Sequence, residues 1–487
     1  MRVKKSVAVM LAAGVIASPL AYATNGMNMA GYGPIAESMG GVSMAYDNGV
    51  AAVINNPATL GLMSDGSARA DVALGDLMPD ASSQGKSSSA TNFFMPAVGY
   101  VRKENQLAYG FGVMAQGGMG TKYSDSSVFG SLWGANFASP GAYPVTDPGL
   151  TNKSEVGVGR LMFPLAYSVS PDLNIGGSID YVWAGMDLQW VIDGMHFGDL
   201  MPGAANNFGS INPTTSTMLG AFQGAMGAGA FTSVDYGYFN FNTSSNFTQK
   251  AKATGFAGNI GFTYKVNAKM TIGGVYHAKT ALSDMKTGSS DATLVMAVRG
   301  GSMGTTAIPL KGQVVVKDFQ WPETYGLGLA YQVDDRWNVM ADYKRIGWAA
   351  VMKNFNMSFI ADGSASNGGF ANTNLDITYF QNWKDQDVIE LGASYKYDDA
   401  TTLRFGGNFA NNPIPDAYVT PLFPAIMKTH YTVGFGHTFT KNDTMDASFV
   451  YAPKVSATNN WSAVGTGSNQ NISLGGYSWQ VMYSHLY

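Results

Sequence analysis

The chain has 487 residues, of which 46% are apolar, 12% are aromatic and only 13% are charged. Because a soluble protein usually carries about a quarter charged residues, this composition argues against a secreted soluble enzyme. The formal net charge of −4 gives no support to nucleic-acid binding, which requires a basic surface, and the absence of cysteine excludes disulfides and thiol chemistry.

The first predicted element is a secretory signal peptide over residues 1–23. Three basic residues precede an apolar stretch over 6–19 that is too short to span a membrane, and Ala21-Tyr22-Ala23 forms a small-x-small cleavage site. A mature chain from Thr24 loses those three basic residues, so that Lys and Arg fall from 29 to 26 against 33 acidic residues, a net charge of −7. An uncleaved anchor helix is the alternative.

Residues 24–66 show no regular alternation and are rich in glycine and turn-forming residues. They precede the first strand, so we expect them to begin on the periplasmic side and to fill the lumen of a barrel. Within them, Asn55-Asn56-Pro57 predicts a rigid turn, because proline fixes φ and favours an extended conformation at the residue before it. The asparagine side chains can pair with backbone groups. An ordinary loop is the alternative, since Asn-Pro also begins turns.

From residue 67 onward, apolar and polar residues alternate with the period of two that indicates strands. The clearest segments are "LNIGGSIDYVW" (173–183), "ATGFAGNIGFTYKV" (253–266), "TYGLGLAYQV" (324–333) and "VIELGASYKY" (388–397). Many are about ten residues or longer, as tilted membrane-spanning strands require, whereas strands of soluble sheets average about five or six. Aromatic residues cluster at the ends of the apolar faces, as in an interfacial girdle.

In the third strand, the alternation that begins at Leu107 breaks at Gln116-Gly117-Gly118-Met119-Gly120. Glycines weaken a strand and mark bulges or bends. The chain therefore either bends here or leaves the strand for a flexible loop.

The connections between strands alternate in length. Tight polar turns occur at 103–106, 170–172, 267–269, 334–336, 398–400 and 441–443. Long segments rich in Gly, Ser and Asn lie between them, at 78–92, 124–153, 191–247, 285–308, 354–384, 411–427 and 455–473. Outer-membrane barrels have short periplasmic turns and long outer loops, and a sheet in hydrocarbon must close because an open edge would leave backbone groups unpaired.

We therefore predict an all-β fold: a transmembrane antiparallel β-barrel of about 14 strands over residues 67–487, with residues 24–66 as an N-terminal hatch plugging the lumen. A large soluble all-β protein is the alternative.

The sequence contains no G-x-S-x-G, H-E-x-x-H or Walker A motif, and its five histidines are scattered. We expect no enzyme activity, no cofactor and no metal site. Strand parity places Arg160, Lys279 and Arg404 on the lumen face, where each could contact the carboxylate of a ligand. A structural salt bridge is the alternative for each of them.

The segment "MGGVSMAYDNGVAAVINNPATLG", after a signal peptide and before a barrel, resembles the FadL/TodX family of outer-membrane transporters for long-chain fatty acids and aromatic hydrocarbons. The family's Asn-Pro-Ala in the hatch is matched by Asn56, Pro57 and Ala58. The segments "DFQWPETYGLGLAYQVDDRWNVMADYKRIGW" and "DVIELGASYKYDDATTLRFGGNFANNPIPD" are also similar to the family, the second with Pro413 and Pro415. The segment 191–247 is long for the family.

The resemblance implies a fourteen-stranded plugged barrel in the outer membrane of a Gram-negative bacterium, with a kink in the third strand that opens the wall sideways. That kink would lie here at Gln116, Gly117, Gly118 and Gly120. We therefore expect passive transport of a hydrophobic compound that leaves sideways at the kink. The residues expected to form a latch between plug and bent strand are Asn55, Asn56, Pro57 and Ala58.

A non-specific porin or a structural barrel is the alternative function. The expected partners are a hydrophobic small molecule and the lipid and lipopolysaccharide of the outer membrane. We expect no nucleic acid, and a monomer.

Overall fold

The structure is a computed structural model that describes residues 25–487 except 127–147, 244, 246–247, 301–303 and 460–469. The predicted signal peptide, residues 1–23, lies outside the described residues. None of the helices among the described residues is both long enough and apolar enough to cross a membrane.

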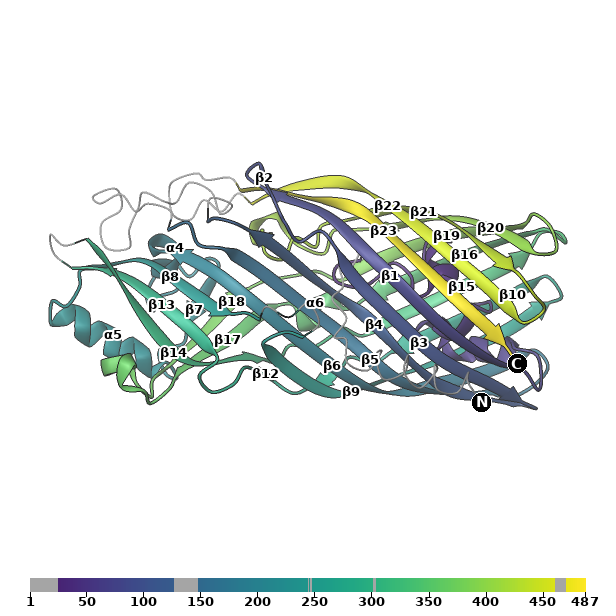
Figure 1. Ribbon diagram of the computed structural model, residues 1–487, viewed down its shortest axis with the longest axis horizontal. Helices are drawn as coiled ribbons and strands as arrows, with labels where there is room; N and C mark the ends of the chain where they lie inside the picture. The colour runs from purple at the N-terminus through teal and green to yellow at the C-terminus, as the bar shows by residue number, and fades with distance from the viewer. Residues whose placement is uncertain (1–24, 127–147, 244, 246–247, 301–303, 460–469) are drawn as a thin grey trace.

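The strands form one antiparallel sheet that closes on itself (Figure 1). The first long strand, β1 (Ala68–Ser83), pairs with the last, β23 (Gln470–Leu486), from Arg69 opposite Leu486 to Ser83 opposite Ile472. From β1 the closed path runs through β3 (Phe93–Glu104), β4 (Leu107–Tyr123), β5 (Asn152–Ser168), β6 (Leu173–Asp193), β9 (Ala251–Asn267), β10 (Met270–His277), β15 (Thr324–Gln332), β16 (Trp337–Ile346), β19 (Gln386–Lys396), β20 (Thr401–Ala410), β21 (Thr429–Thr438), β22 (Asp443–Asn459) and β23.

The wall of this barrel has an apolar outer face. On β9, Phe256 and Ile260 are 61% and 64% exposed, whereas Asn259 and Thr263 on the opposite face are buried. Exposed aromatic and aliphatic side chains recur in the same way on most of the other strands of the closed path. Burying such side chains in water-free surroundings is favourable by about 25 cal/mol per Å², so this face fits lipid. The alternation predicted from the sequence is confirmed.

A second group of strands extends the sheet beyond one end of the barrel, on the left of Figure 1. The C-terminal part of β6 pairs with β8, and the pairing continues from β8 through β13, β14, β17 and β18 to β7. The bounds of the additional strands are β2 (Lys86–Ser87), β7 (Gly209–Ile211), β8 (Ser233–Phe241), β11 (Ala281–Leu282), β12 (Met285–Lys286), β13 (Ala292–Arg299), β14 (Thr305–Lys317), β17 (Asn354–Ala361) and β18 (Asn374–Phe380).

The sequence prediction of long irregular connections over 191–247, 285–308 and 354–384 is therefore wrong. These segments contain strands, and the estimate of about fourteen describes the closed path alone and falls short of the 23 strands in the sheet. Because these segments are rich in Gly, Ser and Asn, their composition is typical of loops. Their strands are stabilised instead by pairing with one another and with β6. These segments also carry the helices α4 (Gly194–Asp199) and α5 (Thr217–Gly227) and the 3₁₀ helix η4 (Ala365–Phe370). The helix α6 (Trp348–Val351) follows β16, and the 3₁₀ helix η5 (Asp416–Tyr418) follows β20.

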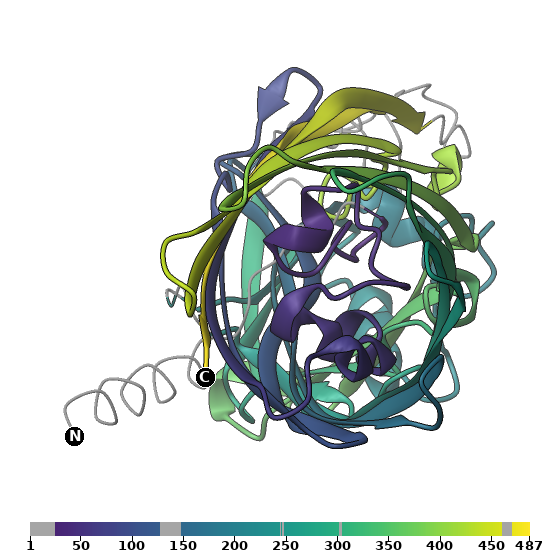
Figure 2. The same ribbon diagram turned by 90° about the vertical axis from the view of Figure 1, so that its right-hand side faces the viewer.

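The N-terminal segment, residues 25–66, lies inside the ring of strands (Figure 2). It consists of short helical pieces joined by turns: α2 (Pro34–Glu37), η1 (Gly49–Ala51), α3 (Ala52–Asn55) and η2 (Pro57–Leu62). Helices this short are not stable alone, so the segment depends on its contacts with the wall. Glycines in the wall permit those contacts, because a Cβ at Gly273 would lie 1.9 Å from the carbonyl oxygen of Met44.

The end of the barrel that carries the extension is predicted to face the outside of the cell. A peptide tag inserted at Gly203, which lies in an exposed turn between α4 and β7 with nothing within 4 Å of the position of a Cβ, should be labelled on intact cells. Gly209, although in the same long segment, is unsuitable because it is buried and pairs with Tyr379. Labelling only after permeabilisation of the outer membrane would reverse the proposed orientation.

Candidate functional site

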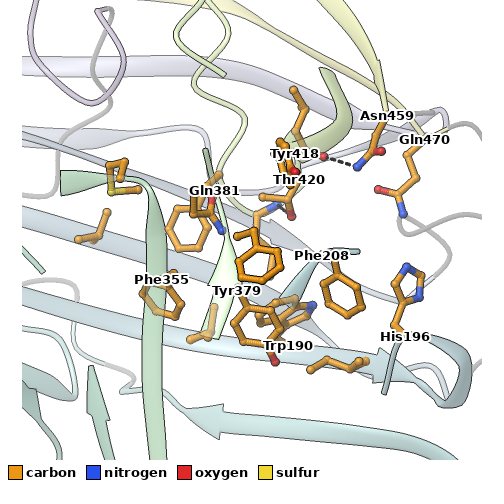
Figure 3. Close-up of a pocket in the computed structure, with 18 of the residues that line it drawn as sticks. Trp190, His196, Phe208, Phe355, Tyr379, Gln381, Tyr418, Thr420, Asn459 and Gln470 are labelled. Atoms are coloured by element: carbon orange, nitrogen blue, oxygen red, sulfur yellow. Dashed lines mark hydrogen bonds between the residues drawn. The ribbon is translucent and has the colours of Figure 1, made fainter. Parts of the chain in front are cut away.

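An apolar cavity of about 120 Å³ lies where the barrel meets the extension (Figure 3). Its wall combines residues far apart in the sequence: Trp190 of β6, Phe208 before β7, Phe355 of β17 and Tyr379 of β18. The rings are packed together, since the centroid of Tyr379 lies 4.4 Å from that of Trp190 and 5.9 Å from that of Phe208. We call it the first cavity.

The first cavity also has a few polar groups. Asp193 caps α4 by accepting hydrogen bonds from the backbone N–H groups of Met195 and His196, and its other oxygen lies 2.5 Å from Nδ1 of His196. Two buried polar atoms in the lining have no hydrogen-bond partner in the part of the chain that the structure describes: the hydroxyl of Tyr379 and Oδ1 of Asn459. The lining contains no Lys or Arg among the described residues.

A smaller apolar cavity, of about 40 Å³, lies between the N-terminal segment and the wall, and we call it the second cavity. Met29 and Val50 of the N-terminal segment line one side of it. The other side is formed by consecutive residues of β3, from Met95 to Gly99, together with Met114 and Ala115 of β4. Because consecutive residues of a strand point to opposite faces, this lining shows that the cavity reaches the edge of β3.

The wall is interrupted at the second cavity. The strands β3 and β4 pair only from Glu104 opposite Leu107 to Val98 opposite Val113. Beyond that point residues 93–97 of β3 pair with β1 alone, and residues 114–123 of β4 stay paired with β5. Pro96, which cannot donate a backbone hydrogen bond, lies on this free edge, where proline is tolerated.

A β-bulge marks the same place in β4. Ala115 pairs with Gly159 and Gly117 pairs with Val158, so Gln116 is an extra residue in the strand. The strand then continues to Tyr123. The interruption in the alternation that the sequence shows at Gln116-Gly117-Gly118-Met119-Gly120 is therefore a bulge within a strand and not the end of the strand.

Residues 27–29 of the N-terminal segment separate the two cavities, since Met27 lines the first and Met29 the second. They also occupy part of the edge that β3 leaves free. Asn28 forms a β-bridge with Gly117, and the N–H of Gly118 donates to the carbonyl of Met27 at 3.1 Å. This approach requires glycine, because a Cβ at Gly117 would lie 2.1 Å from the Met27 oxygen.

A side-chain hydrogen bond reinforces this position. Nε1 of Trp321 donates to Oδ1 of Asn28 at 2.5 Å, and Trp321 is completely buried. The closed arrangement of residues 27–29 thus rests on two backbone contacts to β4 and on one side-chain bond to the segment between β14 and β15.

The predicted latch at Asn55-Asn56-Pro57-Ala58 connects the N-terminal segment to a different part of the wall. Nδ2 of Asn56 donates to the carbonyls of Met44 (2.8 Å) and of Phe262 in β9 (3.1 Å). Nδ2 of Asn55 donates to the carbonyl of Tyr32 at 2.9 Å. Pro57 begins η2, whose following residue Ala58 packs against β6 at Gly176.

The expectation that this turn lies beside the bent strand is therefore wrong. Residues 29–55 fold back through the lumen, so Asn28, not Asn56, reaches β4. The turn holds the base of the N-terminal segment against β6 and β9.

The three basic residues proposed for a carboxylate line neither apolar cavity. Arg160 is buried, with its guanidinium 2.6 Å from Asp180 and 2.6 Å from Oε1 of Gln116. Arg404 pairs with Asp446 at 2.7 Å, beside a polar hollow at the short-turn end of the barrel.

Lys279 is exposed, in contrast to its predicted inward position, because β10 ends at His277 and the alternation does not continue to residue 279. The structure does not bring the three residues together.

Polar contacts fix the middle of the N-terminal segment to the wall. The carboxylate of Asp342 in β16 accepts hydrogen bonds from the backbone N–H groups of Ser43 (2.6 Å) and Met44 (3.1 Å). Glu37 accepts hydrogen bonds from the hydroxyls of Ser448 in β22 and Ser478 in β23. This part of the segment is therefore held more firmly than residues 27–29.

The docked state of the N-terminal segment should become less stable as the pH rises from 4.5 to about 7. Burial raises the pKa of Glu37 from 4.5 to about 7, although the hydroxyls of Ser448 and Ser478 lower it. Below pH 4.5 the contribution of the protonated carboxyl is fully present, and between 4.5 and 7 the docked state loses about 1.4 kcal/mol per pH unit relative to a solvated Glu37.

Hydrogen exchange of a peptide covering residues 34–41, corrected for the intrinsic rate, should therefore be less protected at pH 8 than at pH 5. In Glu37→Gln, which carries no titrating group at this position, protection should change less with pH. The same pH dependence in both proteins would assign it to another group.

Comparison with known proteins shows what the chain resembles. Residues 10–479 match the family model described as outer membrane protein transport protein (OMPP1/FadL/TodX). The toluene transporter TbuX of Ralstonia pickettii is 28% identical and superimposes with a TM-score of 0.71 over 94% of this chain and 99% of that one. The toluene transporter TodX of Pseudomonas putida is 26% identical, with a TM-score of 0.74 over 95% of this chain and 100% of that one.

A 47 kDa outer membrane protein of Pasteurella multocida is 26% identical over 197 residues, which are 40% of this chain. The chain spans less than half the length of the curated relatives that it matches, 43% in this case.

Proposed function

Because the chain belongs to the outer membrane protein transport family (OMPP1/FadL/TodX), we propose that it carries hydrophobic small molecules passively across the outer membrane of a Gram-negative bacterium, without catalysis. The observation that carries the proposal is the pair of apolar cavities on either side of residues 27–29, the second of which reaches the interruption between β3 and β4.

The proposed path has three steps. The solute enters the first cavity, passes residues 27–29 when these leave the edge of β4, and reaches the lipid sideways through the second cavity. Here Gln116, Gly117, Gly118 and Gly120 shape the exit: the bulge at Gln116 bends β4, which stays paired with β5 while β3 diverges. An apolar solute gains about 25 cal/mol for each Å² that it removes from water on entering lipid.

We propose a hatch role for residues 24–66, which argues against the alternative of a non-specific porin. Nearly every residue described between 25 and 63 is buried, and polar contacts fix the segment at Asp342, Ser448 and Ser478. A porin needs an open aqueous lumen. The proposed path lies within one chain, so we propose a monomer whose other partners are the surrounding lipid and lipopolysaccharide.

The size and charge of the first cavity favour a neutral aromatic solute over a long-chain fatty acid. An apolar cavity of about 150 Å³ binds benzene in another protein, and the first cavity has a volume of about 120 Å³. A carboxylate would find no Lys or Arg partner among the described residues of the lining, and Arg160, Lys279 and Arg404 all lie outside it. The two toluene transporters resemble this chain in sequence and structure, which also supports a neutral aromatic solute.

The proposal is tested with the purified protein in liposomes. We expect transfer of radiolabelled toluene to be accelerated relative to liposomes without protein, transfer of oleate to be accelerated much less, and no swelling in an arabinose solution. Swelling at a rate typical of porins would favour the alternative function. Faster transfer of oleate than of toluene would show that the solute class is wrong.

A further inference from the structure

The first cavity contains a polar atom that the packing of the protein does not explain. Tyr379 is only 2% exposed, and its hydroxyl has no hydrogen-bond partner within the described residues. Buried hydroxyl groups in proteins are normally paired, because their desolvation is costly. Tyr379 lies among Trp190, Phe208 and Phe355 in the wall of the cavity (Figure 3).

A phenylalanine would serve the packing of these rings equally well. The contacts of Tyr379 with Trp190 and Phe208 involve the ring alone. The hydroxyl therefore has no structural use that the described residues show, and it remains available as both donor and acceptor.

Asn459, a second residue of the lining, also has a buried polar atom without a partner among the described residues. Nδ2 of Asn459 donates to the carbonyl of Val419 at 2.9 Å, which fixes the amide. Its Oδ1 is then turned away from that bond and is buried without a partner among the described residues. Both Tyr379 and Asn459 belong to the lining, as Figure 3 shows. The cavity thus offers one group that donates or accepts and one group that only accepts.

We propose that the first cavity selects neutral aromatic compounds that carry an oxygen substituent, such as phenols, with the hydroxyl of Tyr379 as the group that recognises the oxygen. This inference rests on the proposed function and narrows its substrate class. The aromatic ring packs against Trp190, Phe208 and Phe355, while the substituent forms a hydrogen bond with Tyr379. An ionised substituent is disfavoured, because Asp193 is in the lining and no basic Lys or Arg side chain of the described residues is there.

The test uses the matched compounds p-cresol and p-xylene, which differ by a hydroxyl in place of a methyl group. Binding to the purified full-length protein in detergent is measured by quenching of tryptophan fluorescence and by calorimetry. Tyr379→Phe removes one oxygen atom and is expected to weaken p-cresol binding about tenfold, the effect of one hydrogen bond. Binding of p-xylene should stay within about twofold of the wild type.

Tyr397→Phe is the matched control. Tyr397 is 62% exposed and lies outside the lining of the cavity, so the loss of its hydroxyl should change neither affinity appreciably. Heat-modifiable migration on a gel verifies that each variant contains a folded barrel.

Each outcome decides the inference. Equal weakening of both compounds by Tyr379→Phe would show that Tyr379 only packs, and no change for p-cresol would show that water or nothing pairs with the hydroxyl; either result overturns the inference. Binding of p-xylene without p-cresol by the wild type would also overturn it but leave the proposed function standing. Binding of neither compound, together with no transfer of toluene into liposomes, would reject the proposed function itself.

Discussion

Ala97→Trp combined with Ala115→Trp is expected to lower the transfer of toluene at least tenfold while the barrel still folds. Both alanines line the second cavity, one on β3 and one on β4, where the two strands have separated. The cavity is only about 40 Å³ in volume, so two indole rings would fill it and block the way to the lipid. Because even a few extra methylenes in a packed site cost about 1–3 kcal/mol, heat-modifiable migration on a gel verifies that the double variant forms a folded barrel.

The control for this double variant is Phe94→Trp. Phe94 lies on the same strand but is 56% exposed on the outer face, so the added bulk points into the lipid and transfer should stay near the wild-type rate. The measurement is the initial rate of toluene transfer into liposomes at equal amounts of folded protein. If the double variant transferred toluene as fast as the wild type, the exit would have to lie elsewhere, with the axis of the barrel as the remaining route.

The outer face of the barrel could be predicted from the sequence because it depends on a local pattern. In a strand each second residue faces lipid, so Phe256, Ile260 and Tyr264 reveal their position by spacing alone. The pattern fails where the strand ends. Strand parity predicts that Lys279 points inward. Because β10 ends at His277, the alternation of faces does not continue to residue 279.

The first cavity could not be predicted because no local pattern encodes it. Trp190, Phe208, Phe355 and Tyr379 come together only through the pairing of β6, β7, β17 and β18 and of their neighbours in the extension. Three of these strands, β7, β17 and β18, lie in segments whose composition resembles that of loops. The sequence showed the glycines of β4, but it could not show that Asn28, rather than Asn56, reaches them, since that depends on how residues 29–55 turn inside the lumen.

Asn28→Ala is expected to raise the rate of toluene transfer. The variant removes the acceptor of the Trp321 indole N–H, which is completely buried when residues 27–29 lie against β4. An unpaired buried donor destabilises a protein by about 1–3 kcal/mol. In the variant this destabilises only the closed arrangement, since water can pair with the indole N–H once residues 27–29 have left β4. Because about 1.4 kcal/mol corresponds to a factor of ten, the ratio of open to closed states should rise by roughly 5-fold to 150-fold, and the rate should rise with it as long as opening limits transfer.

Two further variants test whether loss of the hydrogen bond between Trp321 and Asn28 accounts for the faster transfer of toluene. Trp321→Phe removes the donor of the same bond, so it should also accelerate transfer, and the double variant should be no faster than the faster single variant, because the bond can be lost only once. Asn25→Ala is the control. Its side-chain Oδ1 has no partner among the residues that the structure describes, so its removal leaves no other group unpaired and transfer should not rise.

Swelling of the same liposomes in arabinose distinguishes opening of residues 27–29 alone from loss of the whole N-terminal segment from the lumen. Asn56 and Asp342 hold the rest of the N-terminal segment through bonds that these substitutions do not touch. Faster toluene transfer without sugar entry would therefore mean that residues 27–29 open alone, as the proposed path requires. Sugar entry in Asn28→Ala would mean that the whole segment has left the lumen, and a slower or unchanged transfer of toluene would show that these residues do not control the path.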